Sequence, residues 1–205
     1  WSSDVCSCDL EASFVALFHD LAESRKQETS GSEYVIDSFP IPVCDNIRIS
    51  RCKLYRKEMY RGYTASKKRY FYGLKAHLMI TTDGHPIECF FTPGSVADVT
   101  TLPDFTMDLA PGSSVYADKA YTLYSEEEFL QEAADIHLCP ARKTNSLRAV
   151  PPYVAYWREL MRKRIETAIS QIQVLIPKSI HAVTPRGFEL KAFLFVLAYS
   201  VTKAA

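Results

Sequence analysis

Glycine is scarce in this chain, which has only seven glycines among its 205 residues. With so few, no glycine-rich loop is available to hold a phosphate group. The sequence contains no Walker A motif and no GxGxxG, GxSxG or HExxH pattern. These absences exclude the common nucleotide-binding, α/β-hydrolase and zinc-protease sites.

A long apolar segment is also missing. The longest apolar run, residues 192–201, has about half the ~20 residues that a membrane-spanning helix needs. No basic segment followed by an apolar one opens the chain. We therefore expect no membrane association, no secretion and a cytoplasmic location.

The six cysteines are scattered over the whole chain and do not form the pattern of a disulfide framework. This pattern predicts reduced thiols rather than disulfides. Cys6 and Cys8 have no second Cys/His pair at the spacing of zinc ligands, so we interpret them as free thiols as well.

The net charge is zero, but the charges are segregated along the chain. Residues 48–75 contain ten basic residues and one acid, and residues 142–164 contain seven basic residues and one acid. Between them, residues 83–135 contain eleven acids and one base. Because local field rather than net charge attracts phosphates, the two basic segments favour a polyanion-binding surface. The alternative is a solvated basic face that only balances the acids.

Hydrophobic periodicity predicts an α/β fold. Three successive strands, expected to be antiparallel, precede alternating helices and strands, which predicts a mixed sheet with helices on both faces. The predicted order is a helix over 9–26, a linker over 27–32, strands over 34–36, 70–82 and 87–92, a helix over 97–109, a strand over 114–117, a helix over 125–134, a strand over 136–139, and helices over 153–176 and 187–202.

Local signals refine this prediction. Pro40 and Pro42 are expected to stop the first strand after Asp37. The basic segment 48–69 has no clear period and is predicted to be irregular and exposed. In the following strand, the alternation places Tyr70 and Tyr72 on the apolar face, so we interpret both tyrosines as core residues.

Three acids occupy positions from which their carboxylates could act together in catalysis. Asp37 and Asp118 each follow an apolar strand segment, and Glu166 lies in the middle of a predicted helix. Taken singly, each has a structural interpretation: turn or cap for the aspartates, and an i,i+4 partner of Arg162 for Glu166. If the first and fourth strands are neighbours and the helix crosses them, the three carboxylates converge. Such oxygen ligands suit two Mg²⁺ or Mn²⁺ ions that act on a phosphodiester.

The chain resembles the Asp-Asp-Glu (DDE) transposases of bacterial insertion sequences, most closely the insertion sequence 982 group. The resemblance covers residues 34–200 and rests on long, ordered segments. These are YVIDSFPIPVCDNIRI, RGYTASKKRYFYGLKAHLM, PGSVADVTTL, YADKAY, RKRIETAISQI and IHAVTPRGFELKAFLFVLAYS.

The resemblance implies a ribonuclease-H-like fold, two Mg²⁺ or Mn²⁺ ions, and Asp37, Asp118 and Glu166 as the catalytic, metal-binding triad. It implies that residues 33–205 are the catalytic domain and residues 1–32 a remnant of a longer N-terminal region. Double-stranded DNA, as transposon ends and target, is the expected partner of a homodimer or higher oligomer at the bacterial nucleoid. The basic residues expected to contact this DNA are Lys67, Lys68, Arg69, Lys119, Arg162 and Lys163.

Some interpretations stay open at this point. Asp98 is expected to cap the helix that follows it, with a hydrogen bond near the site as the alternative. The predicted activity is metal-dependent DNA cleavage and strand transfer. The alternatives are a ribonuclease-H-like nuclease without strand transfer and an inactive, truncated remnant that only binds DNA.

Overall fold

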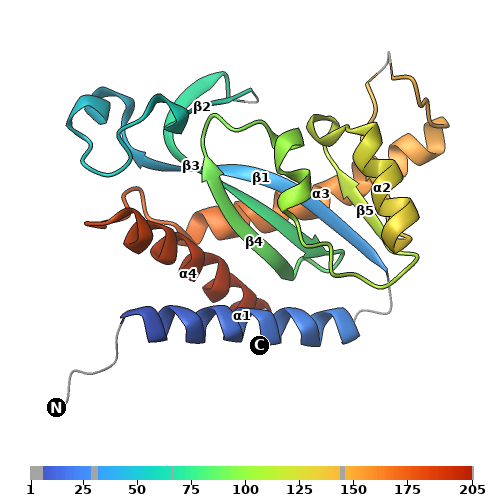
Figure 1. The fold of residues 1–205 in the computed structure, drawn as a ribbon, viewed down its shortest axis with the longest axis horizontal. Coiled ribbons are helices and arrows are strands. Elements are labelled where there is room, and N and C mark those ends of the chain that lie inside the picture. The colour runs from blue at the N-terminus through green and yellow to red at the C-terminus, as the bar shows by residue number, and fades with distance from the viewer. Residues whose placement is uncertain (1–6, 29–31, 66, 144–145, 205) are drawn as a thin grey trace.

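The computed structural model describes residues 7–28, 32–65, 67–143 and 146–204. It has six strands and four α-helices, joined in part by short 3₁₀ helices (Figure 1). The α-helices are α1 (Ser7–Glu28), α2 (Tyr124–Ala134), α3 (Pro152–Leu175) and α4 (Pro185–Ala204). The strands are β1 (Glu33–Cys44), β2 (Arg61–Thr64), β3 (Arg69–Thr81), β4 (Pro86–Pro93), β5 (Ser114–Ala117) and β6 (His137–Pro140).

The strands form one mixed sheet in the order β2-β3-β1-β5-β6, with β4 also paired to β3. β2 and β4 pair with successive parts of β3, and these pairs, like β3 with β1, are antiparallel. β1 with β5 and β5 with β6 are parallel. The predicted mixed α/β sheet is confirmed, and its strand order is consistent with a ribonuclease-H-like fold.

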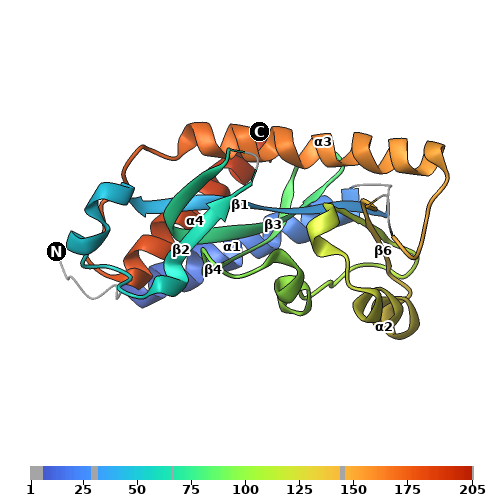
Figure 2. The ribbon, with the colours of Figure 1, turned by 90° about the horizontal axis from the view of Figure 1, so that it is seen from above.

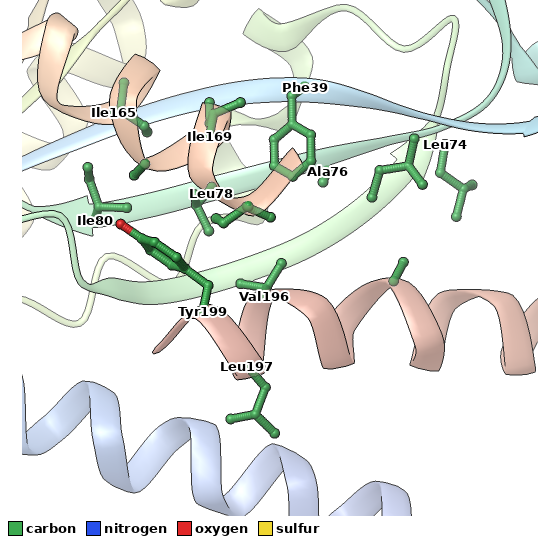
Figure 3. Close-up of a cluster of buried hydrophobic side chains, with 14 of the residues drawn as sticks. Phe39, Leu74, Ala76, Leu78, Ile80, Ile165, Ile169, Val196, Leu197 and Tyr199 are labelled. Carbon is green, nitrogen blue, oxygen red and sulfur yellow. The ribbon is translucent and has the colours of Figure 1, made fainter. Parts of the chain in front are cut away.

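Helices cover both faces of the sheet, as predicted. Figure 2 shows α3 along one face and α2 on the other. On the α3 face, alternate residues of β3 pack with α3 and α4. Figure 3 shows Leu78 and Ile80 of β3 together with Ile165 of α3 and Val196 of α4. The other face packs Ile36 and its neighbours against α2 and the segment after β4.

The strand β1 corrects one prediction, because it does not end at Asp37 but continues through Pro40 and Pro42 to Cys44. β5 pairs with β1 only as far as Ile36, so the rest of β1 has a neighbour, β3, on one side alone. Pro40 and Pro42 are two residues apart, so their backbone nitrogen atoms face the same edge of β1. An edge without a neighbouring strand needs no N–H donors, so it tolerates proline. Asp37 therefore lies within a strand, at the point where its parallel neighbour ends.

The predicted helix over 97–109 is also wrong. The chain forms only a 3₁₀ helix there, Asp98–Asp104, which contains Pro103. A proline in a helix interior removes a hydrogen bond and clashes with the preceding turn, so an α-helix cannot pass through this position.

The segment 48–69 is more regular than predicted. It contains two 3₁₀ helices, Asn46–Arg51 and Glu58–Tyr60, and the short strand β2. At the start of β3, Tyr72 is buried as predicted, but Tyr70 is 60% exposed and is not a core residue. Tyr70 lies on the arm that β2 and β3 form beyond the part of β3 that α3 and α4 cover.

The other predicted elements are confirmed within a few residues. In the predicted linker over 27–32, residues 27 and 28 belong to α1 instead, and residues 29–31 lie outside the described residues, as do the side chains of Cys6 and Cys8. The four cysteines that the structure describes, Cys44, Cys52, Cys89 and Cys139, are free. In the part of the chain that the structure describes, no helix has both the length and the apolarity needed to cross a membrane.

Candidate active site

The three predicted carboxylates line one cavity of about 580 Å³. The last residue pair between the parallel strands β1 and β5 is Ile36 with Ala117. The next residue on each strand is an aspartate, so Asp37 and Asp118 emerge at the same end of neighbouring strands. Glu166 reaches the cavity from the middle of α3, which packs across β1. The convergence expected from the sequence is present as a shared cavity.

Asp37 is the most enclosed of the three acids. The backbone N–H of Ser38 donates a hydrogen bond to its Oδ1 at 2.8 Å. Burial, reinforced by the nearby Asp118 carboxylate, raises the pKa of Asp37 to about 7, against the opposing effects of the Ser38 hydrogen bond and the Arg162 charge. The Asp37 carboxylate thus lies where negative charge is poorly stabilised by the protein alone.

Arg162 supplies positive charge to the cavity. Its Nη2 atom lies 3.3 Å from Oδ1 of Asp118 and 3.5 Å from Oε1 of Glu166. Its Nη1 atom donates to Oε2 of Glu159 at 3.1 Å. The guanidinium therefore lies between two of the three predicted metal ligands and draws both toward itself.

Asp98 and Lys75 also line the cavity. For Asp98, a hydrogen bond near the site was the alternative to the preferred helix cap, whereas Lys75 was not identified from the sequence. The Asp98 carboxylate accepts hydrogen bonds from Ser38 Oγ at 2.8 Å and from Lys75 Nζ at 2.9 Å, and both side chains line the cavity. The Asp98 side chain therefore does not cap the following helix, as was preferred from the sequence, but makes hydrogen bonds at the site. The GSVAD segment was the sequence signal for Asp98, but its partner Lys75 lies far away in the sequence, on β3, and no sequence signal marked it.

The predicted DNA-binding residues lie around this cavity. Lys119, next to Asp118, lines an adjoining cavity of about 360 Å³ together with Lys143, and Ala120 lines both cavities. Lys163 is exposed on α3 beside Glu166. Residues 67–69 are exposed at the connection between β2 and β3. The structure thus brings Lys119 and Lys163 beside the carboxylates and places residues 67–69 on a neighbouring arm.

A comparison with protein families identifies the chain. The family model described as a transposase DDE domain matches residues 26–181, a span that contains all three carboxylates. The chain belongs to the DDE transposase family. No curated protein and no solved structure matches it significantly.

DDE transposase domains generally use divalent metal ions, and this cavity offers three carboxylates as ligands for such ions. Their chemistry fits, because three carboxylates facing one cavity are the hard oxygen donors that Mg²⁺ and Mn²⁺ prefer. The spacing of these carboxylates in the structure, however, does not fit a metal ion. Among the described residues, no group of three or more His, Cys, Asp or Glu side chains is close enough to hold a metal ion. Arg162 occupies the position between two of them.

Proposed function

We propose that this transposase cleaves DNA at the ends of an insertion sequence of the 982 group and joins those ends to target DNA. One observation carries the proposal: carboxylates from β1, from the end of β5 and from α3 line a single cavity in a chain of the DDE transposase family. Asp37, Asp118 and Glu166 are the proposed catalytic triad. The catalytic domain is proposed to span residues 33–205.

The same three side chains would hold the divalent ions. Two Mg²⁺ or Mn²⁺ ions, when bound, would supply Lewis-acid activation of the nucleophile and neutralise charge on the scissile phosphate. The protein would contribute three negative ligands, one of them in a poorly solvated position where an uncompensated charge is costly. A cation therefore has more to gain at this cavity than at an exposed acid cluster.

The basic side chains would position the DNA. Lys119 and Lys163 flank the carboxylates and would contact phosphates on either side of the scissile bond. Arg162, once its carboxylate partners bind cations, is free to turn to a phosphate. These contacts orient the strand, which is the larger part of catalysis in phosphoryl transfer.

The reaction would have two steps. Water attacks the phosphorus atom at the transposon end, and the bond to the 3′-oxygen breaks to leave a free 3′-hydroxyl. That hydroxyl then attacks a phosphodiester of the target, and the target's own 3′-oxygen leaves. Because an element has two ends, we expect a homodimer or higher oligomer on the DNA, acting at the nucleoid.

Two assays test this proposal. The first measures nicking of duplex DNA with Mg²⁺ or Mn²⁺, and the second measures joining of a pre-cleaved end to a plasmid. The parent is compared with Asp37→Asn, Asp118→Asn and Glu166→Gln, and with Glu132→Gln, an exposed acid on α2, as the control. We expect the three cavity variants to lose both activities and the control to keep them.

The outcome also separates the alternatives. Nicking without joining would indicate a ribonuclease-H-like nuclease. Salt-sensitive DNA binding without either reaction would indicate a remnant that only binds DNA. A cavity variant that cuts at the parental rate would remove that residue from the triad.

A further inference from the structure

The β2–β3 arm forms one wall of the carboxylate cavity. β2 pairs with the first residues of β3, and in this register Tyr63 lies directly opposite Tyr70. Tyr63, Thr64 and Ala65 line the cavity together with the three acids. Figure 2 shows the arm standing out from the sheet on the side along which α3 runs. A molecule bound at the three carboxylates would therefore contact this arm.

Two aromatic rings are exposed on this arm: Tyr63 lines the carboxylate cavity, and Tyr70 lines a different cavity together with Glu58 and Arg61. The ring centroids of Tyr63 and Tyr70 lie 4.9 Å apart with a tilt of 54° between the ring planes. The side chains are 51% and 60% exposed, respectively. A cross-strand aromatic pair stabilises a hairpin to a small extent, but here the rings also present apolar surface to the solvent beside a polar cavity.

The arm is held firmly to the sheet beneath. Phe71, on the face opposite the tyrosines, is buried against Gly62 and Gly94. A Cβ atom at Gly62 would lie 2.3 Å from the carbonyl oxygen of Gly94 and 2.4 Å from the Phe71 ring, so only glycine allows this approach. The two exposed rings are thus presented on a fixed support rather than on a loose loop.

The charge around the rings matches a polyanion. Lys67, Lys68 and Arg69 lie at the end of the arm and are exposed. No acid occurs between Met59 and Thr82 in the sequence, and the preceding Glu58, which lines a cavity with Tyr70, is paired with Arg61 at 3.2 Å. Basic side chains beside exposed aromatic rings are the combination that binds single-stranded nucleic acid, because the cations follow the backbone and the rings stack on bases.

We propose that Tyr63 and Tyr70 form a stacking site for an unpaired base of the DNA strand that enters the cavity. Bases within a duplex already stack on both faces, so a protein ring gains contact only with a base that has left the helix. The site would hold a nucleotide next to the scissile phosphate and favour DNA whose end is frayed. This inference rests on the proposed function, since it takes the carboxylate cavity as the place where the strand is cut.

Binding experiments without catalysis test the site. The complete chain is titrated, with EDTA present, against a blunt duplex and against the same duplex with a four-nucleotide unpaired 3′ end carrying 2-aminopurine. We expect the parent to bind the unpaired end more tightly and to change the 2-aminopurine fluorescence. For Tyr63→Ala/Tyr70→Ala we expect affinity for the unpaired end to fall about 5- to 100-fold, with blunt-duplex binding little changed.

Two further variants distinguish stacking from structural damage. Tyr63→Phe/Tyr70→Phe keeps both rings and should bind like the parent. Phe129→Ala removes an aromatic side chain that is 61% exposed on α2, away from the cavity lining, and should also have no effect. Thermal melting confirms that each variant is folded, which both alanine substitutions allow because the side chains are largely in solvent.

The results separate this inference from the function on which it rests. Equal binding of both DNAs by the parent and by the double alanine variant would overturn the stacking site while leaving a DNA-binding transposase. An equal loss for blunt and unpaired ends would assign the tyrosines to general binding and would overturn it too. Absence of salt-sensitive DNA binding by the parent would contradict both proposals.

Discussion

Arg162 lies with its Nη2 atom 3.3 Å from Oδ1 of Asp118, although the two residues come from α3 and from the end of β5. The same guanidinium reaches Glu166 one helical turn further along α3. A positive charge thus occupies the space between two acids that the proposed function assigns to divalent cations. Arginine and metal would compete for the same carboxylates.

The first prediction follows from this competition. Replacing Arg162 by Gln should lower the free energy of unfolding without metal by about 1–2 kcal/mol, because mutually repelling carboxylates lose a partly buried partner. The gain in melting temperature on adding Mg²⁺ should be larger than in the parent, since no guanidinium has to be displaced. Melting curves at increasing Mg²⁺ concentration measure both effects.

Arg164→Gln is the matched control, since it removes an exposed charge from the same helix two residues away. It should leave both quantities near the parental values. If Arg162→Gln gains no more from Mg²⁺ than this control does, the guanidinium does not compete with metal.

A second prediction concerns Asp37→Asn. The asparagine keeps the shape and the acceptor for the Ser38 N–H, but it removes a charge that burial and Asp118 make unfavourable. Without metal, the variant should be as stable as the parent or more stable, by on the order of 1 kcal/mol at neutral pH. Its stabilisation by Mg²⁺ should shrink, because one ligand charge is gone.

Urea unfolding with and without Mg²⁺ provides the measurement, with the exposed Asp104→Asn as control. A clear loss of stability in Asp37→Asn without metal would show that the ionised carboxylate contributes to the fold rather than straining it.

Much of this fold could be predicted from the sequence, because its main elements have one strong period each. The stripe that includes Ile165 on α3 and the alternation through Leu78 on β3 are local patterns, and both pack as predicted. The acids that follow the apolar segments 34–36 and 115–117 were equally visible in the sequence, although Asp37 turned out to lie within β1. Local patterns were sufficient where burial follows directly from position in one element.

The predictions that were wrong have a different origin, because they depend on which other element packs or pairs with the residue concerned. Pro40 is tolerated in β1 only because β5 has already ended beside it. Tyr70 follows the same alternation as the core residues of its strand, yet no helix covers its end of β3. Asp98 begins a 3₁₀ helix and its partner is Lys75 on β3, and sequence spacing cannot show that pair.

The third prediction is a pH dependence of stability that arises from His77. The ring is fully buried, with Nε2 2.9 Å from Thr92 Oγ1 and Nδ1 3.3 Å from Thr101 Oγ1. Burial lowers the pKa of His77 to about 4, aided by the charge of Lys75 and opposed by Asp98. In the unfolded chain the imidazole has its ordinary pKa of about 6.5.

At this imidazole the unfolded state therefore binds more protons between those two values, so the contribution of His77 to stability should fall as the pH is lowered from about 6.5 to about 4. The raised pKa of Asp37 acts in the opposite direction over an overlapping range, so the test is the difference between the parent and a His77 variant. The contribution of this one residue is about 3 kcal/mol over that window. Urea unfolding at several pH values measures the slope of the unfolding free energy against pH, which should become less positive in His77→Phe than in the parent. His137→Gln, which changes an exposed histidine on β6, should keep the parental slope. A His77 variant with that same slope would show that other groups cause the pH dependence.

The fourth prediction concerns the end of the β2–β3 arm. Changing Lys67, Lys68 and Arg69 to Ala should weaken binding to all duplex sequences alike, because cations that contact phosphates carry no sequence information. Each phosphate contact contributes about 0.9 to the slope of log K against log salt concentration. The triple variant should therefore lose roughly 2–3 from the parental slope, while its melting temperature stays near that of the parent because all three side chains are exposed.

Lys178→Ala/Lys203→Ala removes two exposed charges that lie outside the lining of the carboxylate cavity, and it should keep the parental slope. Fluorescence anisotropy with two unrelated duplexes over a range of salt concentrations makes the comparison. A loss confined to one duplex would mean that the arm recognises bases. A triple variant with the parental slope would mean that the phosphates lie elsewhere, and the arm could then not deliver a strand to the tyrosines beside it.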